Sequence, residues 1–173
     1  LNQSDSSVRI IISNDNNIDN YNVYTSSDGI NFGTAQTFAS YDFEYTGLVS
    51  NEITYFKISA SNSLGNSAPS EVLAAVPSAS AHNVIIVNAF DRALTSNTND
   101  YIRQHGQAIM NCNYPFSSAT NDAVTQGLIY LNNYQIADYI LGEESTIDET
   151  FSTTEQSVIE SYLNNGGYLF VSG

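Results

Sequence analysis

Basic side chains are scarce in this sequence of 173 residues. Four Lys and Arg stand against 18 Asp and Glu, which gives a formal net charge of −14 at pH 7 and an isoelectric point near 4.1. Nucleic-acid binding is therefore not expected, because affinity for phosphate depends on clusters of Lys and Arg. Polarity comes instead from Ser, Thr and Asn, a composition that suits a secreted or cell-surface protein.

Cysteine is almost absent as well. Cys112 is the only one, so no disulfide can form within the chain and apolar cores must hold the fold. Cys112 is either a small buried residue near a helix end or a reactive thiol. Neither His82 nor His105 has the spacing of a metal pair, and no glycine-rich phosphate loop follows a strand. No metal or other cofactor is therefore expected.

Long apolar runs are also missing. None approaches the roughly 18 to 20 residues of a membrane span, and the N-terminus LNQSDSSV lacks the basic and apolar parts of a signal peptide. We expect a mature segment without a membrane span. Because residue 1 opens close to a predicted strand and Gly173 directly follows another, we also expect the native polypeptide to continue beyond this segment.

The first half has the pattern of an all-β unit. Six short runs rich in β-branched and aromatic residues are separated by turn residues, of which Ser27-Asp28-Gly29 is the clearest hairpin signal. Regular spacing of such runs predicts an antiparallel sandwich. The predicted strands are 8–13, 20–26, 32–38, 41–48, 53–62 and 71–76.

Two stretches of this half, YNVYTSSDGINF and TGLVSNEITYFKISASNSLGNSAPSEV, resemble the C to G strands of a fibronectin type III domain. The resemblance implies such a β-sandwich over residues 1–77, with its first strand missing or reduced to LNQSD. The chain departs from the family pattern in having no Trp, and in having Thr54 where the corner tyrosine usually stands. Domains of this family are usually spacers. Tyr21, Tyr41 and Tyr45 are either sugar-stacking residues or cross-strand packing residues.

After a short Pro- and Ser-containing linker at 78–82, strands alternate with helices. A nearly continuous apolar strand at 83–90 is followed by helices at 98–110 and 121–132, a strand at 135–142, a helix at 152–165 and a strand at 168–172. Such alternation predicts a doubly wound parallel sheet. Thr98, Thr120 and Ser152 are the expected N-caps, the last with Glu155 in a capping box. Gly106 is expected to let its helix sit close to the sheet.

In an open α/β sheet, ligands bind beyond the carboxyl ends of the strands. Three predicted strands have polar residues at or just beyond their carboxyl ends. Asp91 and Arg92 either orient a substrate or form a structural ion pair. Glu143 and Glu144 act as acid and base, hold a cation, or are simply solvated. Ser172 is a candidate nucleophile, although Phe170 and Val171 precede it where a nucleophile elbow has small residues.

The second half, with the phrases NAFDR, DYIRQHG and ILGEESTIDETFS, resembles an α/β domain that follows fibronectin type III repeats in large secreted bacterial proteins. Those proteins are commonly labelled xanthan lyase or N-acetylmuramoyl-L-alanine amidase. The resemblance implies that residues 83–173 are the N-terminal part of a flavodoxin-like or glutamine amidotransferase-like domain, truncated at its C-terminus.

Three hypotheses follow for function. The first is a non-catalytic part of a secreted surface protein associated with cell-wall or extracellular polysaccharide, with polysaccharide or peptidoglycan and other domains of the same polypeptide as its partners. The second is a hydrolase or lyase with its site at the α/β rim, completed by residues after 173. The third is a structural spacer and protein-interaction module.

Overall fold

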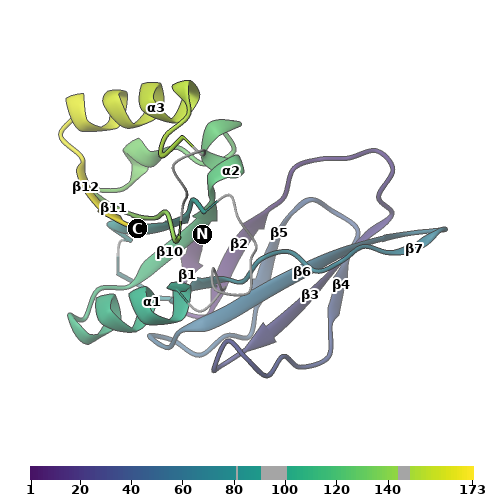
Figure 1. The fold of residues 1–173 in the computed structure, drawn as a ribbon. Helices are drawn as coiled ribbons and strands as arrows, with labels where there is room; N and C mark the ends of the chain where they lie inside the picture. Colours follow the sequence, from purple (N-terminus) through teal and green to yellow (C-terminus); the bar gives the residue numbers. More distant parts are fainter. Residues whose placement is uncertain (81, 91–100, 144–148) are drawn as a thin grey trace.

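The computed structural model describes residues 1–80, 82–90, 101–143 and 149–173. Figure 1 shows two units lying against each other, an all-β unit built from the first half of the chain and an α/β unit built from the second half. Of the sequence predictions, the N-cap Thr98 lies outside the described residues.

The first unit is a sandwich of two antiparallel sheets, as the sequence predicts. One sheet has the order β1-β2-β5, with β1 at Asn2–Ser4, β2 at Ser7–Ile11 and β5 at Asp42–Thr46. The other has the order β4-β3-β6-β7, from Gln36–Phe38, Asn20–Ser26, Thr54–Asn62 and Gly65–Asn66. A further strand, β8 at Leu73–Ala75, also pairs with β6. The first strand is thus present but short.

The core of the sandwich consists of side chains from the two facing sheets. Val8, Val23, Phe56 and Ala75 are buried there, and Phe38 stacks on Phe43 with ring centroids 4.0 Å apart. Along β3, buried positions alternate with half-buried ones over residues 20–23, which produces this one-sided burial.

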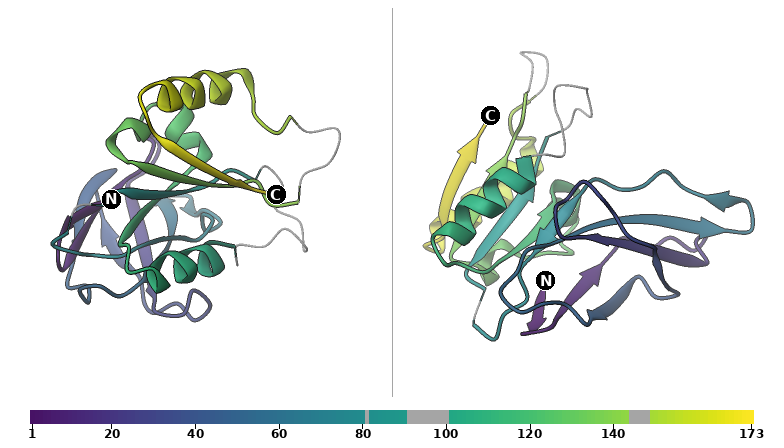
Figure 2. Two further views of the ribbon diagram at one scale, coloured as in Figure 1. Left: turned by 90° about the vertical axis from the view of Figure 1, so that its left-hand side faces the viewer. Right: turned by 90° about the horizontal axis from the view of Figure 1, so that it is seen from below.

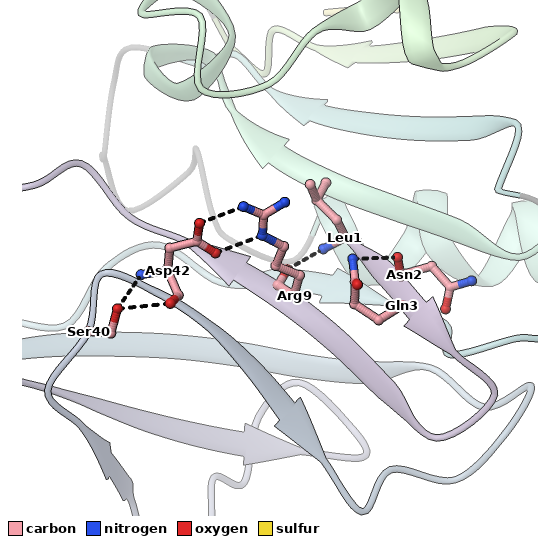
Figure 3. A network of polar contacts seen from close by, with 6 residues as sticks. All are labelled: Leu1, Asn2, Gln3, Arg9, Ser40 and Asp42. Atoms are coloured by element: carbon pink, nitrogen blue, oxygen red, sulfur yellow. Dashed lines mark hydrogen bonds and ion pairs between the residues drawn. The ribbon is translucent and has the colours of Figure 1, made fainter.

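Arg9 and Asp42 join β2 to β5 on the outer surface of the sandwich. The guanidinium Nε and Nη2 donate to the two carboxylate oxygens at 2.7 and 2.5 Å, and Figure 3 shows this pair beside Ser40 and the first residues of the chain. The hydrogen bonds from Arg9 lower the pKa of Asp42. An exposed pair of this kind contributes only about 0–1 kcal/mol to stability. The ion pair with Asp42 occupies Arg9, one of the four Lys and Arg side chains in the sequence.

The second unit is a parallel sheet with the order β10-β9-β11-β12, covered by helices on both faces. Figures 1 and 2 place α2 and α3 on one face and α1 on the other. This arrangement confirms the predicted parallel α/β architecture. The elements in chain order are β9 Val84–Asn88, α1 Tyr101–Asn111, β10 Phe116–Thr120, α2 Asn121–Thr125, the 3-10 helix η1 Leu131–Asn133, β11 Ile136–Ile140, α3 Thr153–Asn164 and β12 Tyr168–Ser172.

Two helix caps match the sequence predictions. Thr120 accepts a hydrogen bond from the backbone N–H of Ala123, and Ser152 and Glu155 form the reciprocal capping box of α3. Helix α3 ends where Gly166 adopts a φ of 87°, a conformation that costs glycine little.

The sequence prediction was wrong at two places in this unit. Strand β10 was not predicted, because its sequence FSSAT is small and polar rather than β-branched. The helix predicted over 121–132 ends at Thr125, since Gly127 with a φ of 72° breaks it before η1 begins.

The two units share one buried core. Tyr55, Val72 and Val76 of the sandwich are buried together with Ile86 and Phe116 of the parallel sheet. At the edge of that sheet, the Ser118 hydroxyl accepts from the N–H of Ala74 at 2.9 Å and donates to its carbonyl at 2.6 Å. The backbone N–H of Val76 also donates to the carbonyl of Phe116. Strand β8 therefore covers the outer edge of β10.

The two ends of the predicted linker 78–82 are also packed into this interface. Ser78 is buried and donates its hydroxyl to the amide oxygen of Asn51. His82 shares a hydrogen bond with the hydroxyl of Ser117, and burial lowers the pKa of His82 to about 4. The ends of this predicted linker are therefore held by side-chain hydrogen bonds to both units.

Replacing Gly106 with Ala should destabilise the protein. A Cβ at Gly106 would lie 2.8 Å from Cζ of Phe116, and overpacking costs about 1–3 kcal/mol, against a gain of about 1 kcal/mol in helix propensity. Urea denaturation should show a net loss of up to about 2 kcal/mol, while the control Gln107→Ala, at an exposed position of α1, changes little. A stabilised Gly106→Ala variant would contradict the close helix–sheet contact.

Glu71 should make stability fall as pH rises. Burial raises the pKa of Glu71 to about 7, although Asn88 Nδ2 donates to its carboxylate at 2.9 Å. Since the unfolded pKa is near 4.5, the folded state binds the extra proton between about pH 4.5 and 7, and stability is lost across that window. Thermal melts should show Glu71→Gln to be more stable than the wild type at pH 8, by up to about 3 kcal/mol, and similar to it at pH 4.5. Glu160→Gln, on the exposed face of α3, should have no such effect.

Candidate functional site

Among the predicted site residues that the structure describes, Ser172 is the one brought into a side-chain cluster with catalytic chemistry. Glu143 is exposed just after β11. Asp91, Arg92 and Glu144 lie outside the described residues, so their proposed roles stay predictions.

The cluster consists of Ser172, His105 and Asp138. His105 Nδ1 lies 2.7 Å from Asp138 Oδ2, and the Ser172 hydroxyl lies 3.4 Å from His105 Nε2. These contacts connect three residues that are 33 and 67 positions apart in the chain. We call this cluster the relay.

Strand geometry explains why the relay assembles. Asp138 lies on the same side of β11 as Ile136 and Ile140, because side chains alternate along a strand. In the parallel register of β11 and β12, Phe170 lies beside Asp138 and Ser172 lies beside Ile140. Helix α1 covers this face, and His105 lies one turn after the buried Ile102.

Burial fixes the roles of the relay atoms. Asp138 is buried, and its Oδ1 has no hydrogen-bond partner among the described residues. A buried carboxylate oxygen requires a donor, so His105 Nδ1 carries the proton that is donated to Oδ2. His105 Nε2 then has a free lone pair directed at the hydroxyl of Ser172. The ring of Phe170, 6.5 Å from that of His105, flanks the imidazole.

An open groove with a volume of about 580 Å³ runs beside the relay. We call it the α1 groove. Its walls are His105 and Asp138 together with the apolar side chains Val84, Ala108, Ile109, Ile136 and Phe170. Cys112 also lines it and is exposed, so the expectation of a buried cysteine was wrong.

The three tyrosines proposed to stack on sugars differ in exposure. Tyr21 is only 5% exposed in the sandwich, so the expectation that its ring is exposed was wrong. Tyr45 is half-buried and packs edge-on against Phe56, with ring centroids 5.8 Å apart. Tyr41 is 44% exposed. Cross-strand packing explains Tyr21 and Tyr45, and sugar binding by Tyr41 stays a prediction.

Sequence reasoning missed His105 and Asp138 as a pair. His105 was considered only as a metal ligand, and the described residues contain no group of three His, Cys, Asp or Glu side chains placed to hold a metal. One feature of the sequence could have indicated the pair, namely the isolated Asp138 within the apolar strand QIADYIL. When such a strand is buried, its carboxylate needs a polar partner. Within the described ranges, no helix is long and apolar enough to cross a membrane.

The fold can be assigned to a class from its strand order. A three-stranded sheet facing a β4-β3-β6-β7 sheet is a β-sandwich that resembles the fibronectin type III fold. The parallel sheet that follows, with its helices, is a partial α/β fold.

Solved structures similar to part of this chain are fibronectin type III domains. The crystal structure of FN3tt is 20% identical, covering 46% of this chain and 85% of that one, with a TM-score of 0.41. The sixth fibronectin type III domain of human fibronectin type III domain containing protein 3 is also 20% identical, covering 45% of this chain and 77% of that one, with a TM-score of 0.37. No family model and no curated protein matches the chain. This likeness concerns the fold alone.

His105→Ala should destabilise the protein, because it leaves the buried carboxylate of Asp138 without its donor. The expected loss in urea denaturation is about 2–3 kcal/mol. Ser172→Ala, which removes only the partly exposed end of the relay, should change stability by less than about 0.5 kcal/mol. Equal losses for the two variants would contradict the view that Asp138 depends on His105.

Proposed function

We propose that this protein is a serine hydrolase that cleaves a carboxylic ester by acyl transfer at the relay. The observation that carries the proposal is the continuous contact from Asp138 through His105 to Ser172, at the carboxyl end of a parallel strand and beside an open groove. Nucleophile, base and orienting carboxylate are the groups that this chemistry needs.

The reaction proceeds in two halves. Ser172 Oγ attacks the ester carbonyl carbon while His105 Nε2 accepts the hydroxyl proton, and the tetrahedral intermediate collapses to an acyl-serine as the alcohol leaves with that proton. Water then attacks the acyl-serine with the same base, which releases the acid and restores the serine. Asp138 holds the imidazole tautomer and stabilises the imidazolium. The 3.4 Å contact from Ser172 to His105 shortens when substrate binds, as catalytic hydrogen bonds do.

Hydrolysis fits the relay better than a lyase reaction. Elimination from a uronic acid requires a cation to neutralise the substrate carboxylate. Among the described residues that line the α1 groove there is no Lys or Arg. The nucleophile and base of the relay, in contrast, are complete for acyl transfer.

The setting we propose is a secreted or cell-surface bacterial protein that acts on extracellular polysaccharide or peptidoglycan, with other domains of the same polypeptide as its partners. Two features support this setting, the acidic composition with few lysines and the resemblance of both halves to modular proteins labelled xanthan lyase or amidase. In such a protein the sandwich serves as a rigid spacer that presents the α/β unit.

A second candidate function is a non-catalytic module of the same kind of surface protein, in which the relay only anchors α1 to the sheet. The observation that favours it is the difference between the two contacts, since His105 lies 2.7 Å from Asp138 but 3.4 Å from Ser172. To anchor α1 to the sheet, only the shorter contact, between His105 and Asp138, is needed.

Active-site labelling separates the two functions. A fluorophosphonate should label Ser172, with the site identified by peptide mass mapping, and the protein should hydrolyse p-nitrophenyl acetate. Ser172→Ala should abolish both signals. Asp138→Asn should lower kcat by about three to four orders of magnitude, because an amide donating to Nδ1 reverses the imidazole tautomer.

If the relay only anchors α1, neither labelling nor ester hydrolysis should depend on Ser172. Stability does not separate the two functions, because Asp138→Asn keeps a hydrogen bond to His105 and should change stability little in either case. Ester hydrolysis that survives in Ser172→Ala, or a label found on the exposed Cys112 instead of Ser172, would overturn the hydrolase proposal in favour of the non-catalytic module.

A further inference from the structure

The α1 groove is apolar along most of its length. Apart from the relay, its polar lining side chains are Gln104, Cys112 and Tyr114, and its walls are Val84, Ala108 and Ile109 with their apolar neighbours. No carboxylate other than Asp138 and no Lys or Arg lines it among the described residues. A charged ligand group placed there would lose hydration without gaining a partner, whereas an apolar group would gain by leaving water.

The groove begins at the relay and extends along α1. It runs from His105 to Cys112 and Tyr114, a distance of roughly 10 Å at the rise of an α-helix. Its volume of about 580 Å³ is far larger than an acetyl group would occupy. Phe170, which is 59% exposed on the edge strand β12, forms the wall nearest the relay.

We infer that the α1 groove binds the acyl chain of the ester substrate, and that the protein prefers uncharged esters of medium-length aliphatic acids. This inference rests on the proposed function. Ser172 does not itself line the groove, but His105 does, and its Nε2 lies 3.4 Å from the Ser172 hydroxyl. An ester whose carbonyl lies at Ser172 therefore has its acyl chain beside His105 at the end of the groove, and the alcohol part faces the rim. The groove therefore sets the specificity for the acid, while the alcohol is left to other contacts.

The test is a series of p-nitrophenyl esters from acetate to octanoate. Burial of each added methylene should raise kcat/KM about fourfold, until the chain reaches Tyr114. Ala108→Phe fills the groove and should remove this dependence on chain length. The matched control Gln107→Phe, on the neighbouring exposed position of α1, should keep the full dependence.

Two outcomes distinguish failure of the groove from failure of the hydrolase. Acetate hydrolysis at Ser172 with a flat chain-length series, or an unchanged series in Ala108→Phe, would overturn the groove assignment alone. A second measurement does not depend on turnover: 1-hexanol should shift the backbone NMR resonances of residues 104–112, and Ala108→Phe should abolish those shifts. Shifts caused by hexanol without any ester hydrolysis would uphold the groove as a site for an apolar chain and contradict the ester substrate. Absence of the shifts would overturn the assignment of the groove as a binding site.

Discussion

The contact between β8 and β10 is the constraint on which the rest of the structure depends. Strand β8 belongs to the sandwich through its pairing with β6, yet the backbone of its Ala74 is hydrogen-bonded to Ser118 of the parallel sheet. Val76, directly after β8, donates its backbone N–H to Phe116 of that sheet. An uncovered edge strand is a site of aggregation, and β8 removes that edge. The same strand contributes Ala74 to the core under α1. The sandwich is thus a structural wall of the α/β unit, and the orientation of α1 follows from packing on both.

That packing buries the carboxylate of Asp138, which is stable there only with a hydrogen-bond donor beside it. Asp138 lies in the middle of a buried strand, and the effective penalty for burying an unpaired charge is several kcal/mol. His105 supplies the hydrogen bond from the overlying helix. Gly106, next to it, brings α1 close enough to the sheet for that bond to form, because no Cβ holds the helix away from Phe116. The geometry that stabilises Asp138 is therefore the geometry that directs Nε2 of the imidazole at Ser172.

Local patterns predicted the elements of this fold far better than its contacts. Strands β3 and β12 have the bounds that alternation and turn residues predict, and both predicted caps on described residues are present. Strand β10 was missed because Ser117 and Ser118 carry no strand signal of their own, and their burial comes from the neighbouring β8 and β9. Ser172 was proposed as a candidate from its place at the end of a strand. Its partners were not, because they depend on the register of β11 with β12 and on the rotation of α1, neither of which is encoded near Ser172.

The negative net charge of the chain disfavours acidic polymers as ligands. The few described basic groups near the sandwich surface are already engaged: Arg9 pairs with Asp42, and the Lys57 ammonium lies 4.3 Å from the ring centre of Phe32. A chain with a net charge of −14 repels a polyanion that comes within about 8 Å at physiological salt. An acidic polysaccharide is therefore a poor ligand for most of this surface. For the proposed hydrolase, a neutral ester group on a neutral polymer meets no such barrier, and the apolar lining of the α1 groove fits its acyl chain. Surface charge and groove chemistry therefore point to the same proposed class of substrate.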